Sequence, residues 1–406
     1  MPATIPINPD VSNIPYGDRK RILDASRGKK GIVDLASGNP DRPMPTFIVE
    51  RMKEALNPGY ARYTDYYGLP ELRQKLSRYL KLECGISADP KDELLITHGV
   101  QEGLYITMRC ILHPGDEVLI PSPHYANYFM NTLACGARPV LICLDQEQGF
   151  LPDLERFRKA VTPRTRALVF CNPSNPLGVV WSKPVLEGLA RFAIGHDLIV
   201  LVDEIYRDFC RAGKPVSIGS FPGMRDRTFT FGGFSKSFMM MGLRVGFVAG
   251  PAEVMFHIKN LHYCVSLCPS SLGQAAALAA LDCPREELEP LYREFVDALG
   301  MIYGSVMTIP GVKCVPAEGG FFIFHDMRCF GMSSMDLAVR LVEEAGVLTL
   351  PGTEFGPYGE GHLRLSVCAK REALIEGINR LRRYAEGRGF VVRTSGDQQV
   401  SRPGKR

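Results

Sequence analysis

Short apolar runs alternate with amphipathic stretches through the first two thirds of the chain. Between about residues 53 and 265 these runs are rich in β-branched residues, and seven of them predict strands: residues 94–97, 117–120, 139–143, 167–170, 198–202, 228–231 and 245–248. Several runs are apolar at consecutive positions, which is typical of strands that helices cover on both faces. Because helical patterns separate the strands, we predict an α/β fold with a mostly parallel sheet. Ligands of such sheets bind beyond the carboxyl ends of the strands.

The pattern changes after about residue 285. Residues 286–307 predict a long helix, residues 320–324 a strand, and residues 371–388 an amphipathic helix that closes the fold. This mixture predicts a smaller α+β domain. We therefore expect four parts: an N-terminal segment that joins the smaller domain (1–44), a large domain (45–285), the smaller domain (286–388), and a polar, glycine-rich tail that we predict to be disordered (389–406).

Composition narrows the function without identifying it. The 406 residues carry a net charge of +4, with 45% hydrophobic and 23% charged residues, which is typical of a globular protein in water. This charge gives no case for a nucleic-acid partner, and no segment approaches the length of a membrane span. The twelve cysteines are dispersed without a C-x-x-C pair, which predicts a reducing compartment and no metal site. With no signal-peptide pattern visible, we expect a cytoplasmic protein.

Residues 230–246 hold the most informative motif. Lys236 follows a predicted strand and a Gly-Gly break, and Arg244 lies eight residues further on with glycines on both sides. A lysine flanked by Ser, Phe and Met is poorly suited to a hydrated surface, and a shielded amine has a lowered pKa and can form a Schiff base. Alone, this lysine could equally reach the surface from a helix start. Because an arginine fork suits two phosphate oxygens, the pair together indicates pyridoxal phosphate.

Polar residues also follow two of the preceding strands. Residues 171–178 read Cys-Asn-Pro-Ser-Asn-Pro-Leu-Gly, a rigid loop that offers the amides of Asn172 and Asn175. Asp203 ends the next strand, where a buried carboxylate needs a cationic partner such as a protonated pyridine nitrogen. Tyr206 could donate to a phenolate oxygen on the same ring. Taken singly, either asparagine could form an Asx-turn, and Asp203 could cap a following helix.

Three other positions add to this set. At Gly99 the chain passes from a strand into a helix whose free N–H groups would suit a phosphate, although many such turns contain glycine. Tyr125 follows another strand and could stack on a flat ring or belong to the core. Arg364 lies in a β-alternating run, where it could form a cross-strand ion pair or hold a carboxylate with two hydrogen bonds.

Taken in order, the motifs Asn-Pro-x-Asn-Pro-x-Gly, Asp-Glu-x-Tyr and Ser-Lys-x₇-Arg-x-Gly resemble those of the fold-type-I pyridoxal-phosphate enzymes, specifically the class I/II aminotransferases. The resemblance extends from about residue 33 to residue 383. It implies a large domain with a mixed, mostly parallel sheet, a smaller α+β domain, and a homodimer with shared active sites. It also implies a transferase of amino acid metabolism and biosynthesis, which moves an amino group between an L-amino acid and a 2-oxo acid.

The resemblance also assigns roles to individual residues. Lys236 matches the Schiff-base lysine that later shuttles the proton, Asp203 the partner of the pyridine nitrogen, and Tyr125 the aromatic that stacks on the ring. Asn175 and Tyr206 match donors to the phenolate oxygen. The implied phosphate site consists of Ser235, Arg244, the backbone of Gly99, Val100 and Gln101, and Tyr63 from the neighbouring subunit. The implied substrate site consists of Gly38, Tyr125, Asn175 and the α-carboxylate clamp Arg364.

Some positions depart from the family pattern. Gly233 stands where a serine or threonine commonly contacts the phosphate, and His124 is an unusual neighbour of Tyr125. Elimination, cyclisation or oxidation of an amino acid on the same scaffold therefore stays open beside transamination. We disfavour a ligand-sensing module fused to a DNA-binding domain, because the cofactor domain begins near residue 45. We also disfavour a nicotinamide dehydrogenase, because no G-x-G-x-x-G follows an early strand.

The sequence says less about the side chain of the substrate. Arg364 predicts an α-carboxylate, and we place no second arginine in the pocket. Three aromatic residues and one methionine near the motifs favour an apolar or mixed pocket: Tyr66, Tyr128, Phe238 and Met239.

Overall fold

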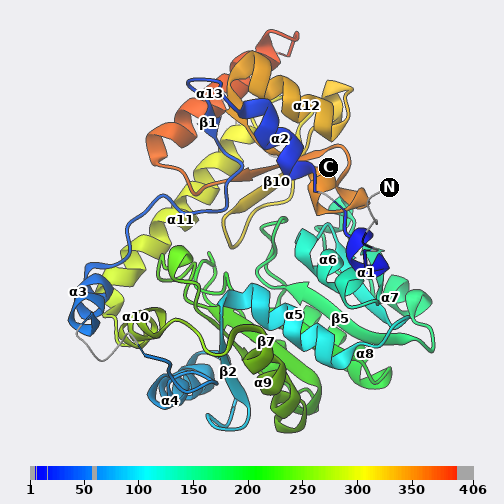
Figure 1. The fold of residues 1–406 in the computed structure, drawn as a ribbon. Helices are drawn as coiled ribbons and strands as arrows, with labels where there is room; N and C mark the ends of the chain where they lie inside the picture. The colour runs from blue at the N-terminus through cyan, green and yellow to red at the C-terminus, as the bar shows by residue number, and fades with distance from the viewer. Residues whose placement is uncertain (1–4, 6, 16, 57–61, 391–406) are drawn as a thin grey trace, which may run out of the picture.

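Two larger sheets organise the protein, one below the other in Figure 1, and a two-stranded sheet accompanies them. The computed structural model describes residue 5 and residues 7–15, 17–56 and 62–390. Most of the tail that we predict to be disordered therefore lies outside the described residues. The lower part of the molecule is built on a seven-stranded sheet, and the upper part on a four-stranded sheet.

All seven strands predicted from the apolar runs join one sheet, in the order β2-β8-β7-β6-β5-β3-β4. Their bounds are Leu94–Thr97 (β2), Glu117–Ser122 (β3), Arg138–Cys143 (β4), Thr165–Cys171 (β5), Ile199–Asp203 (β6), Thr228–Gly233 (β7) and Gly246–Ala249 (β8). From β7 to β4 the neighbours are parallel, while β8 is antiparallel to β7 and β2. The predicted α/β fold with a mostly parallel sheet is confirmed.

Helices flank this sheet and cover its apolar strands (Figure 1). Their bounds are Thr46–Ala55 (α3), Pro70–Tyr79 (α4), Gly99–Ile111 (α5), Ala126–Ala134 (α6), Leu154–Ala160 (α7), Lys183–Gly195 (α8), Ala252–Ser266 (α9) and Ser271–Leu281 (α10). Helix α5 contacts β7 and β8 and packs against α9, while α10 packs against α3 and α4. Among the described helices, none combines the length and the apolar character that a membrane crossing requires.

The upper part contains the four-stranded sheet, in the order β12-β13-β10-β9. Its strands and helices are Lys313–Cys314 (β9), Phe322–Asp326 (β10), Leu350–Pro351 (β12), His362–Ser366 (β13), Arg285–Val306 (α11), Ser334–Arg340 (α12) and Arg371–Glu386 (α13). Both predicted helices and the predicted strand are present. The strand begins two residues later than predicted, because Gly320 has a φ of +72° and its N–H bonds Phe209 O instead of a strand neighbour.

Short helical turns complete the fold. The π-helical turns Leu80–Cys84 (η1) and Leu341–Ala345 (η7) continue α4 and α12. The 3₁₀ turns are Gln146–Gln148 (η2), Ile218–Ser220 (η3), Arg225–Arg227 (η4), Met241–Leu243 (η5), Arg328–Phe330 (η6), Gly352–Phe355 (η8) and Pro357–Gly359 (η9). Of these, η8 matters most for the site, because it lies between the N-terminal segment and β13.

The N-terminal segment reaches both parts of the molecule. Helix α1 (Pro9–Ser12) packs against α6, whereas α2 (Asp18–Ser26) packs against β12 and α12. Strand β1 (Val33–Asp34) pairs in parallel with β11 (Val347–Leu348). The domain boundaries that we place after residues 44 and 285 remain a proposal.

Candidate active site

The residues predicted for the site gather at the carboxyl ends of β5, β6 and β7. A cavity of about 290 Å³ lies there, and its wall includes Phe322 from β10 and Arg364 from β13. The predicted residues that line it are Gly38, Val100, Gln101, Tyr125, Asn175, Asp203, Tyr206, Ser235, Lys236, Arg244 and Arg364. The cavity therefore lies between the two sheets, where side chains from distant parts of the chain converge.

Lys236 lies in the turn that follows β7. Its Nζ donates a hydrogen bond to Gly38 O at 2.7 Å, and a Cβ on Gly38 would lie 3.0 Å from the ring of Phe322. Burial lowers the pKa of the Lys236 ammonium, and the guanidinium groups of Arg364 and Arg244 lower it further. A shielded amine of lowered pKa is the nucleophile that attack on a carbonyl carbon requires.

Asp203 ends β6 and is buried. Its Oδ1 accepts from the Ile205 N–H at 3.1 Å, and its Oδ2 accepts from the hydroxyl of Tyr128 at 3.0 Å. Burial raises the pKa of Asp203 to about 6, although both hydrogen bonds favour the ionised form. Because turns rather than a helix follow Asp203, helix capping does not explain it. A carboxylate in this position is stabilised by a cation placed against it.

An arginine lies against the first residue of α5. Gly99 has a φ of +75°, and a Cβ there would come within 2.6 Å of Arg244 Nη2. Arg244 itself has a φ of 56°, and its Nη1 donates to Met241 O at 3.1 Å. Glycine meets both demands at position 99 without strain. A guanidinium beside the free N–H groups of a helix N-terminus forms a binding site for a dianion.

Arg364 is held from three sides. Its Nη1 donates to Asn175 Oδ1 at 3.1 Å, its Nη2 donates to Ala36 O, and its Cζ lies 4.1 Å from the ring centre of Phe322 and 4.8 Å from that of Phe355. These contacts, not a cross-strand ion pair, fix it. Burial lowers the pKa of Arg364 to about 10, so it stays charged at neutral pH. Its Nε has no partner among the described residues and is free to donate to a bound carboxylate.

Two tyrosines complete the cavity wall. Burial raises the pKa of Tyr206 well above its ordinary value, so its hydroxyl stays a donor. The ring of Tyr125 packs edge-on against Tyr128 with 5.5 Å between ring centres. The amide of Asn127 donates both to the Tyr125 hydroxyl at 3.1 Å and to Gln101 Oε1 at 2.7 Å. These hydrogen bonds fix the orientation of Tyr125.

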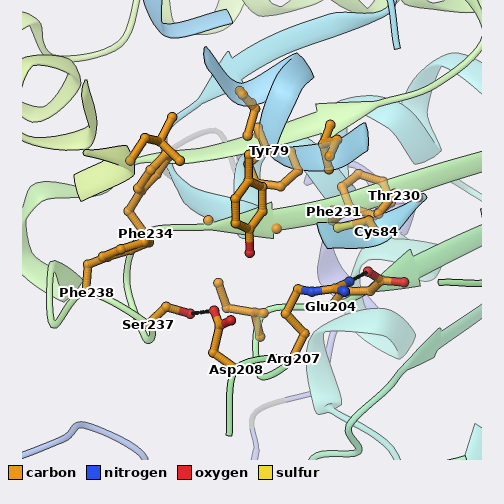
Figure 2. A pocket seen from close by; sticks show the side chains of 17 residues that line it. Tyr79, Cys84, Glu204, Arg207, Asp208, Thr230, Phe231, Phe234, Ser237 and Phe238 are labelled. Carbon is orange, nitrogen blue, oxygen red and sulfur yellow. Dashed lines mark hydrogen bonds and ion pairs between the residues drawn. The ribbon is translucent and has the colours of Figure 1, made fainter. Parts of the chain in front are cut away.

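A second, mostly apolar cavity lies behind the turn that carries Lys236 (Figure 2). In Figure 2, the side chains of Ser237 and Asp208 lie side by side in its lining, and Ser237 Oγ donates to Asp208 Oδ2 at 2.5 Å. Lys214 Nζ lies 3.0 Å from the other oxygen of Asp208. Because Ser237 directly follows Lys236, this contact supports the turn from the side away from the active-site cavity.

Of the four residues that we expected near the substrate side chain, Tyr128 lines the active-site cavity and the other three do not. Phe238 lines the cavity behind the lysine turn, and Tyr66 packs against Tyr263 with 4.8 Å between ring centres. The hydroxyl of Tyr128 donates to Asp203 Oδ2, and Met239 does not line the active-site cavity. An arginine that we did not place in the pocket, Arg19, does line it.

Packing accounts for the two departures from the family pattern. A Cβ on Gly233 would lie 3.0 Å from Gly246 Cα and from Val245 O, so the paired strands leave little room for a serine or threonine. His124 is buried, stacks on Phe129, and its backbone N–H donates to Phe355 O at 2.9 Å. Burial lowers the pKa of His124 to about 4, so it is neutral. Neither residue lines the cavity.

Sequence reasoning missed the roles of two residues that line the cavity. Tyr128 lies in α6 and reads as a core aromatic, and only the fold brings its hydroxyl to Asp203. Arg19 lies in a polar helix without a motif, and only the return of that helix to β12 places it at the cavity. Tyr63, which we predicted for the phosphate site of the neighbouring subunit, is 80% exposed and lies outside this cavity.

The arrangement fits pyridoxal phosphate. Lys236 offers an amine of lowered pKa for the cofactor's aldehyde, and Asp203 offers a buried carboxylate for the protonated ring nitrogen. Arg244 and the start of α5 offer a dianion site for the phosphate. Arg244 lies beside the backbone at the start of α5, an arrangement that suits a small, highly charged group.

The chain belongs to the family of class I and II aminotransferases, whose model matches residues 30–381. It is 35% identical to aromatic-amino-acid aminotransferase 2 of Thermococcus litoralis (92% of this chain, 96% of the relative) and 34% identical to an aspartate aminotransferase of Pyrococcus abyssi (89% and 94%). The crystal structure of an aromatic aminotransferase from Pyrococcus horikoshii superposes with a TM-score of 0.86 at 34% identity, over 91% of this chain and 100% of that one.

These comparisons establish the class of enzyme. The protein is a pyridoxal-phosphate-dependent aminotransferase of fold type I, and its substrates are amino acids and 2-oxo acids. The family therefore supports amino-group transfer over elimination, cyclisation or oxidation. Because these relatives are named for different amino acids, the comparisons leave the substrate of this chain undefined.

Proposed function

We propose that the cavity transfers the amino group of an L-amino acid to a 2-oxo acid with Lys236 as the acting base. The observation that carries this proposal is the buried amine of Lys236, which shares one cavity with Asp203, Arg244 and Arg364. When bound, pyridoxal phosphate supplies an electron-withdrawing ring that stabilises negative charge at the substrate's α-carbon. The protein supplies the binding, the orientation and the proton transfer.

Each residue has a defined task in this proposal. Arg364 binds the α-carboxylate, and its contact with Asn175 Oδ1 leaves the Asn175 amide N–H groups free to donate towards the ring. Lys236 holds the cofactor through Nζ and, once released, takes the proton from the substrate's α-carbon. Tyr206 donates to the ring oxygen, and Asp203 keeps the ring nitrogen protonated. Tyr125 lies against the ring face.

The proposal also covers the phosphate-binding residues, the oligomeric state and the location of the enzyme. We assign the phosphate to Ser235, Arg244 and the backbone of Gly99, Val100 and Gln101. We also propose a homodimer in which Tyr63 of each copy reaches the phosphate of the other, which its exposure and its position outside its own cavity support. A cytoplasmic location is supported by the twelve cysteines, all of which are unpaired.

The proposed function predicts a clean half-reaction. Enzyme loaded with pyridoxal phosphate and given a single L-amino acid should lose the absorbance of the cofactor's aldehyde form and release one 2-oxo acid. The amino group would stay on the cofactor and water would supply the oxygen of the oxo acid, so no ammonia should appear. The measurement is a panel of amino donors followed by absorbance, with products identified by mass. Release of ammonia or uptake of oxygen instead would assign the enzyme to a different chemistry.

Replacing Arg364 with lysine should raise KM for every amino acid donor by about 10- to 100-fold. Lysine keeps the charge but loses the planar fork, and a hydrogen bond to a charged group contributes about 1.5–3 kcal/mol. Because the α-carboxylate is common to all donors, the loss should be similar across the panel. The control is cofactor loading, measured by absorbance, which should not change. An unaltered KM would remove Arg364 from substrate binding.

A further inference from the structure

We propose that Glu102 is a positioning residue for the cofactor phosphate: it holds the first turn of α5 in place through hydrogen bonds to α9. The inference rests on the proposed function, which assigns the phosphate to Ser235, Arg244 and the backbone at the start of α5. Glu102 itself does not line the active-site cavity. It therefore acts through the backbone that it holds and not by touching the phosphate.

The start of α5 has no cap of the ordinary kind. The first N–H groups of a helix find no acceptor within it, and the side chain of the N-cap residue usually accepts from one of them. The N-cap residue of α5 is His98, whose side chain makes no such hydrogen bond. The N–H groups of Gly99, Val100 and Gln101 are therefore left for the phosphate, and another contact has to fix this turn.

Glu102 provides that contact with both of its carboxylate oxygens. Its Oε2 accepts from the backbone N–H of His98 at 2.6 Å, and its Oε1 accepts from Ser266 Oγ at 2.6 Å. His262 Nδ1 lies 3.0 Å from the same Oε1 and donates to it. Burial raises the pKa of the Glu102 carboxyl, but its hydrogen bonds outweigh burial and hold the pKa below its usual value, so the group is ionised at neutral pH. Hydrogen bonds to an ionised group are the stronger class.

Helix α9 gives this carboxylate a firm support. Helices α5 and α9 lie side by side (Figure 1), and His262 is fully buried. Three residues earlier in α9, Lys259 Nζ donates to the carbonyl oxygens of Lys91 and Asp92. Those two residues precede β2, whereas His98 directly follows it. A single helix therefore holds the chain on both sides of β2, the strand that leads into the phosphate turn.

Electrostatics alone predicts the opposite effect for this residue. A negative charge one residue beyond the phosphate-binding backbone repels a dianion, so loss of the charge would by itself strengthen phosphate binding. A positioning role predicts weaker binding on the same change, because the amide of glutamine has one acceptor oxygen where the carboxylate has two. At least one contact of Glu102 is then lost, and the sign of the change in affinity separates the two explanations.

The test is the affinity of cofactor-free enzyme for pyridoxal phosphate and for pyridoxal, followed by the absorbance of the lysine-bound form. Glu102→Gln should raise Kd for pyridoxal phosphate by about 10- to 100-fold, and Kd for pyridoxal by less than about threefold. The matched control is Glu253→Gln, which removes a carboxylate from the first turn of α9 at an exposed position outside the cavity lining. This control should alter neither Kd.

Two further measurements make the result independent of the folding of one variant and of the link to Lys236. Ser266→Ala leaves Glu102 in place and removes one donor, so it should raise Kd for pyridoxal phosphate by about 3- to 10-fold. Pyridoxamine phosphate and pyridoxamine carry no aldehyde and cannot form the link. Their binding, measured by calorimetry, should show the same phosphate-dependent loss in Glu102→Gln.

The outcomes separate this inference from the proposed function. Equal losses for ligands with and without phosphate, tighter binding of the phosphate ligand, or no loss in Glu102→Gln would overturn the role of Glu102 and leave the proposed function standing. An unaltered enzyme that binds pyridoxal as tightly as pyridoxal phosphate would overturn both the phosphate assignment and the role of Glu102. If no amino acid supports the half-reaction while the phosphate-specific loss persists, the proposed transfer fails and the role of Glu102 stands.

Discussion

Lys236→Ala should lower kcat by roughly 10³-fold or more, because a positioned proton-transfer group contributes about 10²–10⁴-fold and this lysine also holds the cofactor. Lys236→Arg should be equally inactive, since a guanidinium keeps its proton at working pH. The measurement is the single-turnover release of oxo acid from a preloaded enzyme. The donor that is most active with the unaltered protein should be used.

Lys259 provides an internal control for this prediction. It is buried, and burial lowers its pKa to about 8, but its Nζ donates to the carbonyl oxygens of Lys91 and Asp92, away from the cavity. After borohydride reduction of the loaded enzyme, peptide mapping should find the adduct at Lys236 and none at Lys259. An adduct at Lys259, or an unlabelled Lys236, would show that burial of an amine had been mistaken for a cofactor site.

The pH dependence of cofactor capture follows from the same lysine. An amine attacks an aldehyde only when deprotonated, so the capture rate of cofactor-free enzyme should rise with pH through the pKa of Lys236. Burial lowers that pKa in the folded protein, so the midpoint should lie below the value of about 10.4 for free lysine. A midpoint at or above that of free lysine would contradict the environment described for Nζ.

The sheet and most of the site could be predicted because their signals are local. Each strand is a run of apolar residues bounded by turn residues. The polar residues of the site come at or directly after the ends of β5, β6 and β7. Asn175, Asp203 and Lys236 each lie within a few residues of a strand end. Because parallel strands end at one edge, order along the chain was enough to bring these residues together.

The substrate side of the cavity could not be predicted, because it depends on contacts between distant segments. Arg19 reaches the cavity through η8, some 335 residues away along the chain, and its helix carries no motif. Tyr128 was missed for a different reason. It lies on an apolar helix, where its sequence position predicts a core residue, whereas in the folded protein its hydroxyl donates to Asp203. The roles of the hydroxyl groups of buried tyrosines and of charged residues on exposed helices can be assigned only from tertiary packing.

Asp203→Asn should lower kcat by about 10²- to 10⁴-fold while the enzyme still binds its cofactor. The amide has the shape of the carboxylate and keeps an oxygen acceptor, but it cannot pair with a protonated ring nitrogen. Removing one partner of a buried ion pair costs about 3–5 kcal/mol, and each 1.4 kcal/mol in the barrier is about tenfold in rate. The measurement is kcat at saturating donor, with cofactor content determined by absorbance in the same samples.

Tyr128→Phe provides the graded comparison, because it leaves the carboxylate in place and removes the 3.0 Å hydrogen bond to Oδ2. A hydrogen bond to a charged group contributes about 1.5–3 kcal/mol, so this variant should lose at most about 10- to 100-fold. It should also be less impaired than Asp203→Asn. If both variants lose the same activity, the charge of Asp203 is not what the cofactor needs, and the buried carboxylate serves to position Tyr128 instead. A larger loss for Asp203→Asn assigns the effect to the negative charge that faces the ring nitrogen.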